Sequence, residues 1–311
     1  MNLFDLHCDT AFEIFKDKTS LYENDLDISL SRAESAFTHY AQVMAIWTNK
    51  RKNDEECWLD FLAMRENLVY EAQKNGAEIC VSASEAKNAW KKEKSALFLG
   101  VEGARIFAGN IERVKEIYDL GVRFLTLQWE GKDVIGGSHD TDAPLTDFGR
   151  DVLKKCAELG IIVDVSHASR TATAECLAFS KEHGAPVIAT HSNSYYVVPH
   201  TRNLTDEEAK DIAACGGVIG VSLAPSHLSS VCKADILDII KHISHYFDIG
   251  IGRSVCLGCD LDGISSKPKG IENVADLPKI AAAMRDAGFS EEDKENVFYG
   301  NAARFAAWAL K

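Results

Sequence analysis

The stretch Gly160-Ile161-Ile162-Val163-Asp164-Val165-Ser166-His167 shows the pattern from which the fold is predicted. It is a run of valine and isoleucine that ends in a potential metal ligand, His167. Runs of this kind are typical of strands in a parallel sheet that is covered on both faces. The segment before it predicts a helix, because Thr146 can cap its start and Gly160 can end it. The stretch therefore indicates a helix followed by a buried strand.

Four other segments repeat this pattern, and each ends in a carboxylate or an imidazole. They are 3–10 with His7 and Asp9, 95–103 with Glu102, 185–192 with His191, and 255–263 with Asp260. Alternate side chains share one face of a strand, so His7 and Asp9 point the same way and Cys8 points oppositely. Each histidine alone fits a satisfied core residue, and each acid alone fits a turn. Their shared position at strand ends instead predicts a two-metal hydrolase site, in which Glu102 can supply the shared anionic bridge.

The spacing of the apolar runs predicts a barrel. Eight strands are expected, at about 3–7, 38–46, 96–102, 122–127, 161–166, 186–190, 217–222 and 254–260, with room for a crossover helix between them. Further helices are expected over 54–73, after a capping box at Thr205, and from Ser290 through Phe305. No linker or repeat interrupts the chain, so residues 1–311 are expected to form a single α/β domain, a (β/α)₈ TIM-like barrel. Its metal site should lie at the C-terminal ends of the strands.

The composition indicates a cytoplasmic enzyme. Hydrophobic residues make up 46% of the chain, and 34 basic against 47 acidic residues give a net charge of −13, which favours neither nucleic acid nor an anionic membrane. No apolar stretch reaches the roughly 18 residues of a membrane span, and a first strand at Leu3 leaves no room for a signal peptide. The nine cysteines do not suggest a disulfide framework, and the one Cys-x-x-Cys, at Cys256 and Cys259, fits buried thiols.

Several motifs, in their order and approximate spacing, resemble the membrane (renal) dipeptidases, which are dinuclear zinc peptidases of the amidohydrolase-like barrel class. The resemblance covers nearly the whole chain. Besides the first segment, the motifs are Leu125-Thr126-Leu127, Leu145-Thr146-Asp147-Phe148-Gly149, Asp164-Val165-Ser166-His167, Thr190-His191-Ser192, Thr201-Arg202-Asn203, Gly258-Cys259-Asp260-Leu261-Asp262-Gly263 and Gly300-Asn301-Ala302-Ala303-Arg304-Phe305.

The resemblance implies two Zn²⁺ per chain and a role for each residue of the site. His7 and Asp9 are expected to bind one zinc, His167 and His191 the other, and Glu102 both. Asp260 would handle the proton of a bridging hydroxide that attacks the peptide bond. Arg202 would hold the free carboxylate of a dipeptide, because its guanidinium offers two parallel donors to a planar carboxylate. The implied function is a dipeptidase that also accepts L,D-dipeptides.

One position departs from the family pattern. The best-known members have a histidine two residues after the segment Leu125-Thr126-Leu127, whereas this chain has Trp129, which is expected to bind substrate in a reshaped pocket. His139 lies in a nearby glycine-rich loop and is within reach of the same region. Two alternatives stay open: a related barrel amidohydrolase acting on another small amide or lactam, and a catalytically weakened metal-binding relative. The expected partner is a small dipeptide, and a homodimer is left open.

Other polar residues are placed outside the site. Asp262 fits a turn beside Gly263, and Asp164 should face away from His167 on its strand. Surface or supporting positions are expected for a set of six histidines, which comprises His39, His183, His200, His227, His242 and His245.

Overall fold

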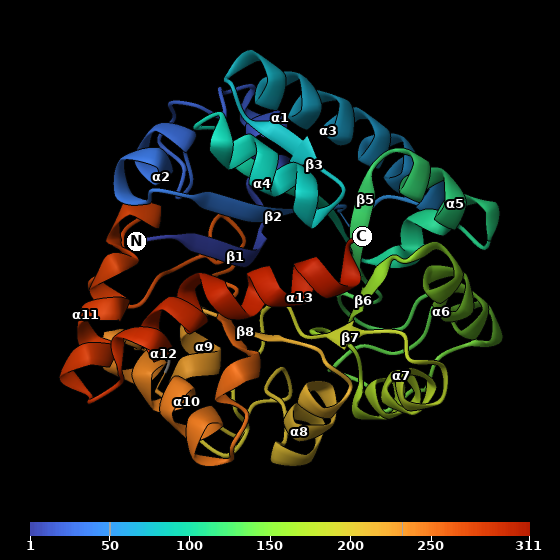
Figure 1. The fold of residues 1–311 in the computed structure, drawn as a ribbon. Coiled ribbons are helices and arrows are strands. Elements are labelled where there is room, and N and C mark those ends of the chain that lie inside the picture. Colours follow the sequence, from blue (N-terminus) through green and yellow to red (C-terminus); the bar gives the residue numbers. More distant parts are fainter. Residues whose placement is uncertain (50, 232) are drawn as a thin grey trace.

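Eight parallel strands form the central ring of the computed structural model, which describes all residues except 50 and 232. The strands are β1 (Leu3–Cys8), β2 (Tyr40–Trp47), β4 (Ala96–Glu102), β5 (Val122–Thr126), β6 (Ile162–Asp164), β7 (Val187–Ile188), β8 (Ile219–Val221) and β9 (Val255–Leu257). Their order is β7-β6-β5-β4-β2-β1-β9-β8, and a parallel bridge between Ala189 and Ile219 joins the two ends. The predicted (β/α)₈ barrel is therefore confirmed (Figure 1).

Helices fill the connections and surround the ring. The α-helices are α1 (Thr10–Asp17), α2 (Leu30–Ala36), α3 (Asp54–Lys74), α4 (Ala83–Lys91), α5 (Glu112–Asp119), α6 (Asp147–Leu159), α7 (Arg170–His183), α8 (Asp206–Ala214), α9 (Pro225–Leu228), α10 (Ile236–Asp248), α11 (Pro278–Asp286), α12 (Glu291–Glu295) and α13 (Asn301–Ala309). Short 3₁₀ turns occupy Ala104–Phe107, Gly252–Ser254 and Val274–Asp276. The predicted caps are present: Thr146 accepts a hydrogen bond from the Gly149 N–H, Gly160 ends α6, and Thr205 starts α8 in a capping box.

Two details of the strands differ from the prediction. A ninth strand, β3 (Glu78–Cys80), lies outside the ring and pairs only with β4. In addition, β6 to β9 are only two or three residues long, shorter than the apolar runs that contain them. Beyond β6 and β7 the chain still continues in the strand direction, but side chains take over part of the hydrogen bonding. These continuations carry the predicted site residues.

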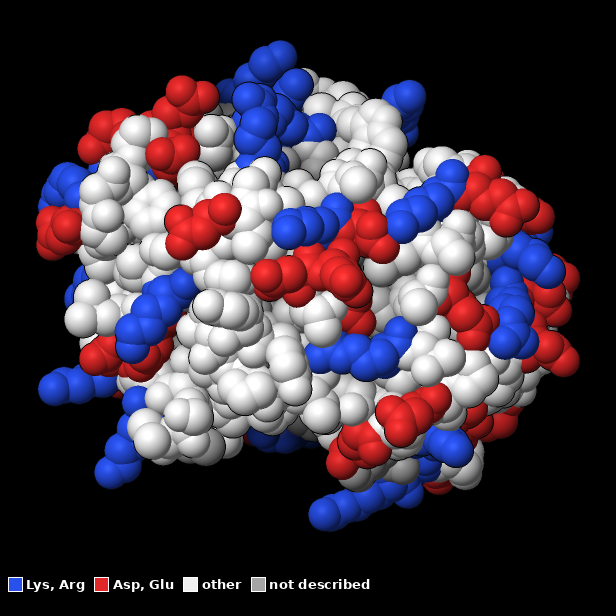
Figure 2. Space-filling model, turned by 90° about the horizontal axis from the view of Figure 1, so that it is seen from below, with Lys and Arg blue, Asp and Glu red and all other residues white. Residues whose placement is uncertain are grey.

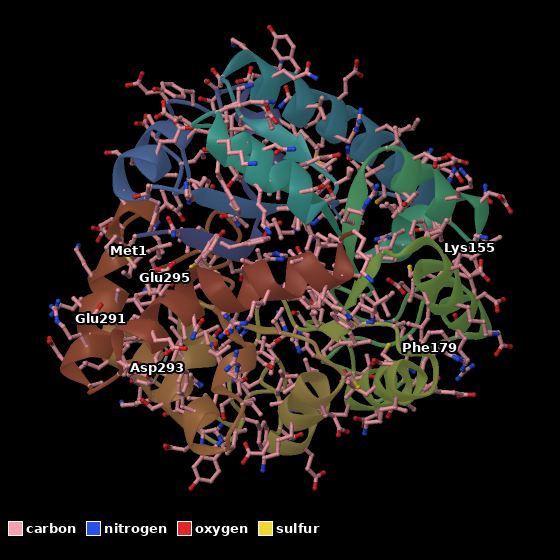
Figure 3. All side chains as sticks on the ribbon, in the orientation of Figure 1. Met1, Lys155, Phe179, Glu291, Asp293 and Glu295 are labelled. Atoms are coloured by element: carbon pink, nitrogen blue, oxygen red, sulfur yellow. The ribbon has the colours of Figure 1, made fainter. Side chains whose placement is uncertain are left out.

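The predicted last helix is interrupted. A π-helical turn over Asn296–Gly300 separates α12 from α13. The side-chain amide of Asn301, the first residue of α13, donates to the carbonyl oxygens of Gly252 (2.9 Å) and Val255 (2.7 Å) and ties the helix to the start of β9. A π turn inserts an extra residue into the helical repeat and rotates the helix beyond it. The side chain of Asn2 donates to Glu295, and Figure 3 shows Met1 close to Glu295, so the start of the chain contacts this same segment.

The core has an inner part and an outer part. The inner part contains the inward side chains of the strands, including Phe4 stacked on Phe98 with ring centroids 5.3 Å apart, and it includes Ala302, Phe305 and Ala306 of α13. In Figure 1, α13 crosses in front of the strands. The outer part lies between the ring and its helices. Since α13 packs on residues near the strand starts, the end of the barrel that remains available for a site is the C-terminal end of the strands.

Two further features concern the surface charge and the character of the helices. On the face shown in Figure 2, basic and acidic side chains are interspersed, and the basic ones do not form a continuous patch. Within the described residues, none of the helices combines the length and the apolar character that crossing a bilayer requires.

Candidate metal centre

Six side chains from five segments meet at the C-terminal end of the barrel. The Glu102 Oε1 atom lies 3.0 Å from His167 Nε2, 3.5 Å from His191 Nε2 and 3.6 Å from His7 Nε2. The His7 Nε2 atom lies 3.7 Å from Asp9 Oδ2 and 3.9 Å from Asp260 Oδ1. Two overlapping groups have the spacing of metal ligands: His7 with Glu102 and His191, and His7 with Asp9 and Asp260. All six residues predicted for the metals and the proton are thus brought together.

A bulge in β1 directs His7 into the site. The register between β1 and β2 shifts between Asp5 and Cys8, which reverses the inward and outward alternation. Phe4 and Leu6 face the inner core, whereas Cys8 lies in the outer core against Met44. Asp5 holds the bulge, because its buried carboxylate accepts from the His7 N–H at 2.9 Å and from the Cys259 N–H at 3.1 Å. Asp5 thereby fixes the segments that carry His7 and Asp260.

Asp164 supports the opposite side of the centre. Its carboxylate accepts five hydrogen bonds: from the hydroxyls of Thr126, Ser166 and Thr190, each at 2.6 Å, and from the N–H groups of Ser166 and Thr190, each at 2.9 Å. The Ser166 hydroxyl in turn accepts from the His191 N–H at 3.0 Å. From the sequence Asp164 is expected outside the site, and its carboxylate indeed lies beneath the ligand cluster. The signal that could have identified its supporting role is its position three residues before His167 in a strand otherwise free of charge.

The hydrogen bonds of two histidines leave the nitrogens that face each other without protons. His167 Nδ1 donates to the Trp129 carbonyl oxygen at 2.7 Å, so its Nε2 carries a lone pair. The Thr190 hydroxyl donates to Asp164 and therefore accepts from His191 Nδ1 at 2.8 Å, which leaves a lone pair on His191 Nε2 as well. The two Nε2 atoms are 2.9 Å apart. Two facing lone pairs repel each other unless a cation lies against both, and this is how oriented imidazoles bind metals.

The electrostatics also fit cations. Burial raises the pKa of Asp260 well above its ordinary range, and burial together with Glu102 raises that of Asp9 to about 6. Burial alone would lower the pKa of His7, yet Glu102, Asp9 and Asp260 raise it to about 10. The buried His7 Nε2 and Asp9 Oδ1 atoms have no hydrogen-bond partner among the described residues. Carboxylates crowded in this way ionise together only beside positive charge, so the residues present suit metal ions.

Asp260 and Asp262 differ in what they contact. Both have positive φ, 60° and 66°, in the turn that follows β9. Asp262 faces away from the cluster and accepts from the Thr10 hydroxyl and the Asp27 N–H, both at 2.6 Å, which agrees with a structural role. A side chain at Gly263 would lie 2.1 Å from Asp9 Oδ2 and 2.4 Å from Asp260 Oδ1. The turn therefore needs glycine there to leave space for the two acids.

Arg202 is a buried cation to which the described residues supply no carboxylate partner. It is 5% exposed, its Nη1 atom has no hydrogen-bond partner among the described residues, and no ion pair joins the guanidinium to a described carboxylate. Burial lowers its pKa to about 10, although Asp260 and Glu102 act in the other direction, so it remains charged at neutral pH. A buried charge of this kind is unfavourable unless an anion joins it. The site around Arg202 therefore has the chemistry of an anion site.

Arg202 and the ligand cluster share one cavity. This cavity, about 280 Å³, is lined by Arg202, Asp260, Trp129 and three further histidines, His139, His200 and His227. His139 thus reaches the mouth of the site. His200 and His227, which the sequence placed on the surface or in supporting positions, line the cavity instead, because loops distant in sequence fold over it. Trp129 also lines a second cavity of about 210 Å³ with Phe12 and Trp47, so its ring separates two parts of the site.

The segment that carries Arg202 is anchored from beneath by His242 of α10. The Ser194 N–H donates to His242 Nδ1 at 3.0 Å, and the Nε2 atom lies 3.3 Å from the Leu228 carbonyl oxygen. Burial lowers the pKa of His242 to about 4. The ring is therefore neutral at pH 7, and it must accept at Nδ1 for the Ser194 contact to form.

Comparison with known proteins places this arrangement among metallopeptidases. The family model for membrane dipeptidases (peptidase family M19) matches residues 1–309. A dipeptidase tcpJ from Claviceps purpurea (strain 20.1) is 30% identical over 242 residues, which is 76% of this chain and 56% of the relative, so the chain spans about half the length of that curated protein.

Two solved structures share the fold over the whole chain. The first, a metallo peptidase from Rhodobacter sphaeroides liganded with a phosphinate mimic of the dipeptide L-Ala-D-Ala, has a TM-score of 0.91 and 24% identity, with 100% of this chain and 99% of that chain covered. The second, the metallo peptidase dipeptidase AC, has a TM-score of 0.91 and 25% identity with the same coverage.

We expect His242 to make the protein less stable in acid. The native imidazole takes up a proton only near pH 4, whereas the unfolded one does so near its ordinary pKa of 6.5. The unfolded chain thus binds more protons in this window, and stability falls as the pH drops through it, by about 2 kcal/mol at pH 5. His242→Asn keeps an acceptor near Nδ1 without titrating. Urea unfolding at pH 7.5 and pH 5 should show a smaller loss for the variant, and equal losses would contradict the assignment.

Proposed function

The chain belongs to the membrane dipeptidase family, and from this premise we propose that it is a zinc-dependent dipeptidase that hydrolyses the single peptide bond of dipeptides, L,D-dipeptides included. The observation that carries the proposal is the buried Arg202, which no described carboxylate pairs, in the same cavity as the ligand cluster. A free carboxylate one residue from the bond to be cleaved is what distinguishes a dipeptide from a longer peptide. The relative that binds a dipeptide mimic has the same fold.

In this proposal the chain binds two Zn²⁺. His7 and Asp9 would hold one ion, His167 and His191 would hold the other, and Glu102 would serve both. Support comes from the Glu102 oxygen within 3.0–3.6 Å of three imidazole nitrogens and from the lone pairs that face each other on His167 and His191. When bound, such ions polarise the scissile carbonyl and lower the pKa of a water molecule toward roughly 7. Imidazole and carboxylate ligands suit zinc.

Asp260 is proposed as the group that moves the proton. Its carboxylate lies at the edge of the cluster, 3.9 Å from His7 and lining the substrate cavity, so it can take a proton from the attacking water and deliver it to the departing amine. The turn that holds it is tied to β1, because the Asp260 N–H donates to the His7 carbonyl oxygen at 3.1 Å. The acid is thus held at a fixed distance from the residues that bind metal.

Arg202 and Trp129 are proposed to position the substrate. The guanidinium fork would bind the C-terminal carboxylate, which satisfies the buried cation and places the peptide carbonyl at the metal centre. Trp129 would form the wall between the parts of the site that receive the two residues of the dipeptide. A substrate without a free carboxylate would leave the buried Arg202 charge unpaired, which is why a dipeptide is favoured over a simple amide or lactam.

We further propose that residues 1–311 act as one hydrolase domain and that the protein works in the cytoplasm. The support for the second point is that the eight cysteines within the described residues are all free, and that seven of them are buried. A homodimer is compatible with the site, since all of its proposed residues come from one chain.

Metal analysis tests the centre. Protein purified without chelator and supplied with zinc should contain close to two zinc ions per chain, because the ligands are too many for one tetrahedral ion once Glu102 is shared. His167→Ala should lower the content toward one, whereas His183→Ala, a change on the outside of α7, should leave it at two. Elemental analysis measures the number of zinc ions per chain in each protein. A content near zero in the parent protein would refute the metal centre.

Asp260→Asn tests the proton transfer. The amide keeps the shape of the side chain but cannot accept the proton, so kcat should fall by about 10²-fold or more. The zinc content should stay close to that of the parent protein. Asp262→Asn in the same turn is the matched control and should keep most of the activity. A kcat within a few-fold of the parent value for Asp260→Asn would assign the proton transfer to another group.

Dipeptide amides test Arg202. Because the amide lacks the carboxylate, the parent protein should cleave Ala-Ala-NH₂ at least about 10²-fold less efficiently than Ala-Ala, as kcat/KM. Arg202→Ala should lower kcat/KM for Ala-Ala and remove most of the difference between the two substrates. If the parent protein cleaves both equally well, Arg202 does not bind the carboxylate.

A further inference from the structure

The cavity next to the metal centre has a wall of three imidazoles that the proposed mechanism does not use. The His139 and His200 ring centroids are 6.4 Å apart, and those of His200 and His227 are 4.7 Å apart. All three line the cavity that also contains Arg202. They come from three segments, after β5, β7 and β8, with His227 in the short helix α9, so only the folded barrel brings them together.

Each imidazole has hydrogen-bonding capacity to spare. His200 Nδ1 accepts from the Arg202 N–H at 3.1 Å, so its proton lies on Nε2, for which the described residues supply no partner. The buried Nδ1 atom of His227 is also unpartnered among them. His139 uses Nδ1 toward the Thr201 hydroxyl at 2.9 Å. Burial and the Arg202 charge hold the pKa of His139 at about 4 and that of His227 at about 2, so the rings are neutral donors at pH 7.

The imidazoles of His200 and His227 add donors beyond those of the Arg202 fork. The Arg202 fork by itself matches the C-terminal carboxylate of a dipeptide. The imidazoles of His200 and His227 then remain, in the field of a cation that no described carboxylate pairs. The acids that line the same cavity are Asp9, Glu102 and Asp260, which belong to the metal centre, and the exposed Glu130. A second acceptor on the substrate would use the remaining donors.

We infer that the enzyme prefers dipeptides whose C-terminal residue is aspartate or glutamate, and that His200 and His227 bind its side-chain carboxylate. The inference rests on the proposed dipeptidase function. The acidic side chain belongs to the C-terminal residue because Arg202, which would hold the main-chain carboxylate of that residue, is two positions from His200 and shares its cavity. Both carboxylates of one residue thus meet donors from one short segment and from α9 beside it.

Matched pairs of substrates test the preference. Zinc-loaded protein is assayed on Ala-Asp against Ala-Asn and on Ala-Glu against Ala-Gln, each with an L- and with a D-residue at the C-terminal position. The members of a pair have nearly the same shape and differ in charge. In at least one pair, kcat/KM for the acid should exceed that for its amide by about tenfold or more, the usual advantage of a hydrogen bond to a charged group.

Two variants test whether His200 and His227 cause the preference for the acidic substrate. His227→Phe keeps a flat ring without donors, and His200→Asn keeps an acceptor for the Arg202 N–H but loses the Nε2 donor. In either variant the acid-to-amide ratio should fall at least about threefold toward one. His183→Asn removes an exposed imidazole on α7 and should leave the ratio unchanged. Because the readout is a ratio between substrates, a general loss of activity does not imitate the effect.

The outcomes separate the two proposals. If no dipeptide is cleaved, the proposed function itself fails. If dipeptides are cleaved but every amide is as good as its acid, the inference is overturned and the dipeptidase function stands. A preference for the acid that both variants retain would also overturn the assignment to His200 and His227.

Discussion

The carboxylate of Asp164 is the interaction on which the site depends. Strands β6 and β7 pair over only two residue positions. Beyond these positions, few backbone hydrogen bonds between the strands are left to fix the conformation of the chain. Asp164 supplies the acceptors instead, with five hydrogen bonds that join the ends of β5, β6 and β7. Through Thr190 it also fixes which nitrogen of His191 carries a proton. One buried acid therefore sets both the path of the backbone and the chemistry of a proposed ligand.

Asp5 has the same function on the other side of the barrel. It joins the bulge of β1 to the turn after β9, and so holds His7 and Asp260 together. The two acids explain how a site built from five separate segments can be held together although most of its residues lie outside regular strands. Rigid support of this kind matters for catalysis, because a displacement of about 1 Å in a reacting group can lower the rate by about 10²-fold.

The charges of the site are complementary to cations on one side and to an anion on the other. Three acids crowd around His7, while Arg202 has no carboxylate partner in the described part of the chain. The folded protein alone leaves both groups unbalanced, and such imbalance lowers stability. Cations beside the acids and an anion beside the arginine would restore the balance. The destabilised arrangement is therefore consistent with a binding site and hard to explain as part of a structural core.

The sequence by itself determined the barrel and the residues at its strand ends, since apolar runs of strand length and the acids or histidines that follow them are local features. Parallel strands in a ring place those ends together, so the meeting of His7, Glu102, His167, His191 and Asp260 followed from the pattern. Only the tertiary structure decided which other side chains reach the site. His200 lies in a loop and His227 in the four-residue helix α9, and their position depends on how these two segments cross the barrel mouth. The supporting roles of Asp164 and Asp5 also could not be predicted from the sequence. The hydrogen-bond partners of a buried acid in a strand lie on neighbouring strands that are distant in sequence.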